Sequence, residues 1–347
     1  MGTIKWSIIG GLAAIVVLLA GCEKEEIAVA DLVEMEIVEE VEVHQEEDTL
    51  FDEYWPQTID SEICKTIGEC RDLGDEYGSE HFSSLLSGLT HSNQLSFLNV
   101  NAVEDENIFA ITENDVLDDE FITARYEFLD NEIVLTEGEE EISFESIANL
   151  VFALYERDKV NFQYLDFLEN VYPFSDTYRG RLVLPSNLIP HWLQSFTVST
   201  LIHEYGHFLT WNKADFDTSE TCATELFYVK PYGECYHADS YMNLYYKAFL
   251  NEYDEQWLHD ENRTVEGRLA FYEENKDSFV TVYASVNPYE DIAESFTHFM
   301  LTPYNDSPQT IPEEKVNFFY QFPELVEYRA FVLKELKERK DEMWSFY

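Results

Sequence analysis

The sequence predicts an α+β protein with a small mixed sheet, an apolar central helix that carries ionisable side chains, and a mostly helical C-terminal half. Strand patterns lie at 126–135 and 178–184, both before the middle helices. Apolar residues at helical spacing occupy about 143–157, 192 or 196 to 211, 238–252, 289–301 and 323–343. Apolar residues make up 45% of the 347-residue chain, which is ordinary for a globular protein.

Residues 1–22 have the organisation of an export signal. Lys5 precedes a 13-residue apolar stretch at 8–20, which is too short to span a membrane comfortably. The stretch runs into Leu-Ala-Gly-Cys at 19–22, which resembles the lipobox of bacterial lipoproteins. That resemblance implies lipidation of Cys22 and a protein anchored in the lipid bilayer of the cell envelope. An uncleaved anchor with an incidental cysteine is the alternative. Because Glu23 replaces the aspartate that retains lipoproteins in the inner membrane, we expect the outer membrane if the host is Gram-negative.

Residues 23–54 form an acidic segment. Between residues 23 and 53, 14 acidic side chains accompany one lysine. Like charges at this density repel one another and cannot bury a core, so we expect a tether. Alternation of apolar residues with Glu at 33–43 leaves open a strand that docks on the folded part.

The remaining chain divides into an N-terminal α+β part, 55–174, and a C-terminal part, 175–347. In the first, Asp130-Asn131 predicts a turn between two short strands. Ser143 is a suitable N-cap for the helix that follows. In the second, the strand at 178–184 is stopped by Pro185.

Four cysteines remain once Cys22 is set aside. An even number in an exported protein favours disulfides, and proximity in sequence favours Cys64–Cys70 and Cys222–Cys235. Two other pairings stay open. A structural zinc site is less favoured, because neither pair has the short spacing of such sites.

The charge of the chain is strongly negative. Seventy acidic residues against 21 basic ones give a net charge of −49. Such a field excludes nucleic acid as a partner and favours basic or neutral ligands.

The sequence His203-Glu204-Tyr205-Gly206-His207 lies on a predicted helix. Two histidines four residues apart project from one face of a helix, where their imidazoles can share one zinc ion. Glu204 lies beside the first ligand, where a carboxylate can take a proton from a zinc-activated water. The alternative is a pair of core histidines beside an incidental glutamate.

A catalytic zinc usually has three protein ligands. Lys213 stands where one extended form of the motif has a third histidine, so that subclass is excluded. Glu290 and Glu294 are again four apart, on a helix that begins near Pro288. One of them can bind the metal while the other accepts the N–H of a ligand histidine. Further candidates for the third ligand are Asp291, His237 and His298.

The residues from Tyr283 to Phe296 resemble the second motif of the lethal-factor-like peptidases and of the zinc-binding metallopeptidase lipoproteins. The chain thus looks like a gluzincin, and the resemblance implies a zincin-like fold with Glu290 as the third ligand. It also implies that Glu294 orients His203 and that Tyr283 donates a hydrogen bond to the oxyanion of the reaction.

In zincins an edge strand above the active-site helix pairs with the substrate backbone. The resemblance assigns this role to the strand at 178–184. Arg179 and Arg181 on this strand are either contacts for a substrate carboxylate or carbonyl, or solvent-exposed charges.

These motifs together predict a zinc metallopeptidase of the gluzincin type with one Zn²⁺. It would hydrolyse peptide bonds through a zinc-activated water at the cell surface, with a peptide or protein, preferably basic, as substrate. Two alternatives stay open: a non-catalytic surface binding lipoprotein with a zincin fold, and a zinc hydrolase of a non-peptide amide.

Overall fold

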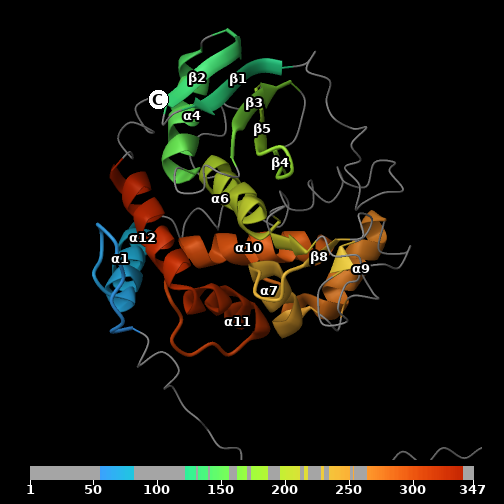
Figure 1. Cartoon of the computed structure of the whole chain (residues 1–347). Helices are drawn as coiled ribbons and strands as arrows, with labels where there is room; N and C mark the ends of the chain where they lie inside the picture. Colours follow the sequence, from blue (N-terminus) through green and yellow to red (C-terminus); the bar gives the residue numbers. More distant parts are fainter. Residues whose placement is uncertain are drawn as a thin grey trace, which may run out of the picture. The chain divides into compact units, whose positions relative to one another are not determined.

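The described part of the chain contains a five-stranded sheet and a larger set of helices (Figure 1). The computed structural model of the chain describes residues 55–81, 122–129, 132–139, 141–155, 162–169, 173–186, 196–211, 215–217, 228–229, 234–250, 253 and 264–338. The export signal, Cys22, the acidic tether and Cys222 lie outside these residues. None of the described helices is long and apolar enough to cross a membrane. The boundary expected between the N-terminal part, 55–174, and the C-terminal part, 175–347, stays a prediction.

The sheet has the strand order β2-β1-β3-β5-β4. Its strands are β1 (Ile122–Leu129), β2 (Glu132–Gly138), β3 (Tyr164–Leu168), β4 (Phe174–Asp176) and β5 (Arg181–Pro185). β3 and β5 are parallel, and the other neighbours are antiparallel. The expected hairpin around residues 130–131 is confirmed by β1 and β2, and the α+β class with a small mixed sheet is confirmed as well.

The strand predicted at 178–184 is not an edge strand. It corresponds to β5, which pairs with β3 on one side and with β4 on the other. All five residues of β5 are buried. The edge of the sheet on this side is β4, so the expectation that 178–184 is open to a substrate backbone was wrong.

Arg179 and Arg181, the two arginines of the predicted strand, both form ion pairs. Arg181 is buried, and its Nη1 lies 3.3 Å from Oδ2 of Asp166 on β3. Arg125 of β1 binds the same carboxylate with two nitrogens, at 2.7 and 2.8 Å. Arg179 lies at the surface, 3.1 Å from Asp176. Arg181 therefore stabilises the sheet and is not exposed.

Helices form most of the remaining described structure. They are α1 (Ile67–His81), α4 (Ile142–Tyr155), α6 (Phe196–Thr210), α7 (Tyr241–Phe249), α9 (Val265–Asn275), α10 (Pro288–Leu301), α11 (Ile311–Asn317) and α12 (Pro323–Glu338). A three-stranded sheet of β6 (Phe216–Asp217), β8 (Glu234–Tyr236) and β7 (Tyr228–Val229) lies between α6 and α7 in the sequence. The predicted helices correspond to α4, α6, α7, α10 and α12, whereas α1, α9 and α11 were not predicted.

The helices pack on the sheet and on one another through aromatic side chains. Phe144 of α4 stacks on Phe167 of β3 with ring centroids 4.4 Å apart. Tyr205 of α6 stacks on Tyr328 of α12 at 4.6 Å. One continuous cluster of buried apolar residues therefore joins sheet and helices, and α6 lies within it.

The predicted disulfide Cys64–Cys70 is confirmed. Its Cα atoms are 5.2 Å apart, and it fastens the first turn of α1 to the segment before it. Cys235 also takes part in a disulfide. Its predicted partner, Cys222, lies outside the described residues, so that pairing stays a prediction.

A buried ion pair joins α10 to α11. Nζ of Lys315 lies 2.6 Å from Oδ2 of Asp291, and both side chains are fully buried. The hydroxyl of Tyr245 on α7 donates to the same oxygen at 3.2 Å. Burial raises the pKa of Asp291 to about 6, although the Lys315 ammonium opposes this shift. The carboxylate of Asp291 therefore takes part in the contacts between α7, α10 and α11.

We expect Lys315→Met to lower the free energy of unfolding by about 3–5 kcal/mol, because it leaves a buried carboxylate without its cation. Chemical denaturation measures this value. The double variant Lys315→Met/Asp291→Asn should recover most of the loss. Lys334→Met, which removes a more exposed ion pair, should cost less than about 1 kcal/mol. Equal effects of the two single variants would contradict the role of the buried pair.

Candidate metal centre

Helices α6 and α10 approach each other closely at Gly206 and Ala293. A Cβ atom added to Gly206 would lie 3.2 Å from Cα of Ala293 and 3.3 Å from a ring carbon of Phe296. A contact this short is tighter than side chains normally accept, so only glycine fits without a shift. His203 and Glu290 each lie three residues before this contact. The approach of the two backbones therefore brings their side chains together.

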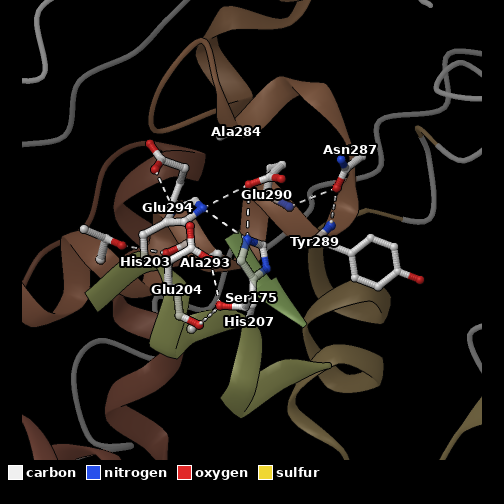
Figure 2. A network of polar contacts seen from close by, with 12 residues as sticks. Ser175, His203, Glu204, His207, Ala284, Asn287, Tyr289, Glu290, Ala293 and Glu294 are labelled. Atoms are coloured by element: carbon white, nitrogen blue, oxygen red, sulfur yellow. Dashed lines mark hydrogen bonds and ion pairs between the residues drawn. The ribbon is translucent and has the colours of Figure 1, made fainter. Parts of the chain in front are cut away.

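Three potential ligand atoms converge between the two helices (Figure 2). Nε2 of His203 lies 3.1 Å from Nε2 of His207 and 3.0 Å from Oε2 of Glu290. The third distance, from Nε2 of His207 to Oε2 of Glu290, is 3.4 Å. An ion bound tetrahedrally at ~2.0–2.1 Å would separate its ligands by about 3.3–3.4 Å. The three residues can therefore hold one metal ion.

The orientation of His203 is fixed by Glu294 and Thr281. Oε1 of Glu294 lies 2.8 Å from Nδ1 of His203. The other carboxylate oxygen accepts a hydrogen bond from the Thr281 hydroxyl at 2.7 Å, and Thr281 accepts from the backbone N–H of Ala284. A carboxylate beside Nδ1 keeps the proton on that nitrogen, so the lone pair of Nε2 is directed at the ion site.

The start of α10 positions Glu290. Oδ1 of Asn287 accepts hydrogen bonds from the backbone N–H groups of Tyr289 and Glu290, at 2.8 and 3.0 Å. Asn287 is extended and Pro288 follows it as the first helical residue, which is a favourable helix start. Glu290 thus lies in the first turn, where the positive end of the helix dipole stabilises a carboxylate.

The charges of the cluster stabilise one another. Burial lowers the pKa of His203, but the carboxylates of Glu290 and Glu294 outweigh burial and hold that pKa well above its usual value. Burial raises the pKa of Glu290, yet His207 and His203 outweigh it and hold the pKa below its usual range. In the metal-free cluster a protonated His203 supplies the positive charge beside these carboxylates, and a bound metal ion would take the place of that proton.

Glu204 lies next to His203 on α6 and is buried. Its carboxylate accepts a hydrogen bond of 2.7 Å from the hydroxyl of Ser175 on the edge strand β4. The same hydroxyl lies 3.1 Å from the backbone oxygen of Glu204. The sequence did not predict a role for Ser175 or Thr281 at this site, since neither residue belongs to a motif.

Tyr283 lies beside the cluster. Its ring centroid is 5.8 Å from that of His203. Burial raises the pKa of Tyr283 well above its usual value, and the carboxylates of Glu290, Glu204 and Glu294 add to the shift. The phenol is therefore protonated at neutral pH and able to donate a hydrogen bond.

The remaining candidate ligands lie outside the cluster. Asp291 binds Lys315, on a different side of α10 from Glu290. His298 lies on α10 one turn after Glu294, and burial lowers its pKa. His237 is exposed directly after β8. Within the described ranges, His203, His207 and Glu290 form the one group of three that could hold a metal ion.

Comparison of the chain with protein-family models, curated proteins and solved structures finds no match. The interpretation of the centre therefore depends on its own geometry and chemistry.

We expect Glu290→Gln to weaken zinc binding by more than about a hundredfold, because it removes a charged ligand, whereas Glu294→Gln should weaken it by about ten- to a hundredfold. Competition with a chromophoric chelator measures both affinities. Glu274→Gln, at an exposed position of α9, serves as the control and should bind zinc like the wild type. Wild-type affinity in Glu290→Gln would show that the third ligand is a different residue.

Proposed function

We propose that the protein is a zinc-dependent metallopeptidase of the gluzincin type, with a zincin-like fold. The observation that carries this proposal is the convergence of His203, His207 and Glu290 within 3.0–3.4 Å of one another. Two imidazoles and one carboxylate form the donor set of hydrolytic zinc sites, which leave one position open. Zn²⁺ is the ion that fits this set best, and it supplies a Lewis acid that activates water and polarises a carbonyl.

The chain's own residues then carry the proton transfers. Glu204, adjacent to the ligand His203, takes a proton from the attacking water and delivers it to the leaving amine nitrogen. Tyr283 donates a hydrogen bond to the oxygen that becomes negatively charged when the water attacks the carbonyl. Glu294 keeps His203 in the tautomer that binds metal.

The substrate that we propose is an extended peptide, bound along β4. This strand forms one edge of the sheet, and its neighbour on the other side is β5. An extended peptide can add to such an edge through backbone hydrogen bonds. The surrounding surface then determines which peptide side chains are preferred. The contact of Ser175 with Glu204 places β4 directly beside the proposed base.

The lipobox-like sequence at Cys22 supports a location at the cell surface, with the acidic segment after it as the tether. A protein that binds its ligand without catalysis would not need a carboxylate next to the metal ligand on this helix. The presence of Glu204 in a buried, hydrogen-bonded position favours an enzyme over that alternative.

We expect Glu204→Gln to keep one equivalent of zinc but to lower peptide hydrolysis by at least about a hundredfold, because the amide cannot accept the proton. Cleavage of a diverse peptide library, followed by mass spectrometry with and without a chelator, measures the activity. Glu274→Gln is again the matched control. Wild-type rates in Glu204→Gln would disprove the role of the base. A wild-type, zinc-loaded protein that cleaves no peptide would disprove the peptidase.

The net charge of −49 predicts that basic peptides are preferred. For a Lys- and Arg-rich peptide, kcat/KM should fall several-fold between about 0.05 and 0.5 M NaCl, because salt screens the attraction. A neutral peptide of equal length, assayed in parallel, should show little change. The same salt dependence for both peptides would contradict electrostatic selection.

A further inference from the structure

The edge strand β4 contacts the metal-binding helix through Ser175. Ser175 is the middle residue of the strand, and it pairs with Leu182 of β5. Its hydroxyl reaches the carboxylate of Glu204, 29 residues further along the chain. The contact connects the strand that would hold the substrate to the residue that would move the proton.

The hydroxyl of Ser175 has one proton and two acceptors within reach. Oε2 of Glu204 lies at 2.7 Å and the backbone oxygen of the same residue at 3.1 Å. An ionised carboxylate is the stronger acceptor, and its bond is the shorter of the two. Because both acceptors belong to Glu204, the two contacts together hold the hydroxyl in place beside this residue.

We propose that Ser175 is a positioning residue for Glu204, and this proposal rests on the proposed function. In the resting site the hydroxyl holds Oε2 and leaves Oε1 to accept the proton of the attacking water. The same contact keeps the carboxyl group aligned for delivery of that proton to the leaving amine. Ser175 neither gains nor loses a proton in this sequence.

A matched pair of variants isolates the hydroxyl. Ser175→Thr keeps it, whereas Ser175→Val has nearly the same shape without it, and both β-branched residues suit a strand. We expect Ser175→Val to lower kcat by about ten- to a hundredfold, because a misplaced catalytic group costs rate rather than binding. KM and bound zinc should stay within about twofold, and Ser175→Thr should retain kcat within about threefold.

Three outcomes of this comparison would overturn the proposal. Wild-type kcat in Ser175→Val would show that the hydroxyl is not needed. An equal loss in Ser175→Thr and Ser175→Val would assign the effect to the shape of the strand, and a loss of zinc in Ser175→Val would assign it to the metal site.

A second measurement does not require peptidase activity. In metal-free protein, Ser175→Val should lower Tm by about 2–5 °C, because it removes the hydrogen bond that Ser175 donates to the Glu204 carboxylate. In a Glu204→Leu background the same substitution should have little effect. Equal Tm shifts in both backgrounds would disprove the contact itself. If the wild type cleaves no peptide but the shifts differ, the proposed function fails while the contact stands.

Discussion

The close approach of α6 and α10 at Gly206 and Ala293 determines the geometry of the candidate centre. A metal site tolerates only about 0.2 Å of error in its ligand distances. A side chain at Gly206 would displace the neighbouring helix by a few tenths of an ångström, since a Cβ atom there would already lie 3.2 Å from the Cα of Ala293. The spacing of His203 and His207 is a property of one helix, but their distance to Glu290 depends on this packing. Chemistry at the site therefore depends on a contact between two small residues.

The second requirement of the centre is a partner for each of the buried carboxylates near it. A buried carboxylate without a partner costs several kcal/mol, so partly satisfied clusters are unstable. Glu294 divides its oxygens between His203 and Thr281, and Asn287 binds the backbone of Glu290. Burial in the apolar cluster around α6 excludes water and strengthens each of these contacts. Burial opposes the pKa shifts of His203 and Glu290, but the opposite charges around each group outweigh it, so the pKa of His203 lies above its usual value and that of Glu290 below.

The sequence predicted those features that follow from spacing within one element. The two histidines, Glu204 and the α6 and α10 helices are of this kind. It could not predict Ser175 or Thr281, because their contacts are made between elements and involve one ordinary hydroxyl each. The sequence left Asp291 as a candidate ligand, because its contact with Lys315 depends on how α10 is rotated against α11. The position of β5 was open to prediction: the continuous apolar run at 182–184 is typical of an interior strand rather than an edge.

The edge strand of the sheet is β4 and not the predicted strand at 178–184, and this changes how the sheet relates to the centre. With β5 in the interior, the strand that contacts the proposed base is the three-residue β4, which is too short to bind a long peptide through its backbone alone. Backbone pairing at β4 would therefore fix the register of a few residues around the scissile bond. Affinity for the rest of a substrate would come from other surfaces, and the negative charge of the chain is the strongest long-range term available. Backbone pairing at β4 and attraction by charge contribute separately. The pairing would orient the bound peptide at Glu204, whereas the charge would raise the rate at which peptide and protein meet.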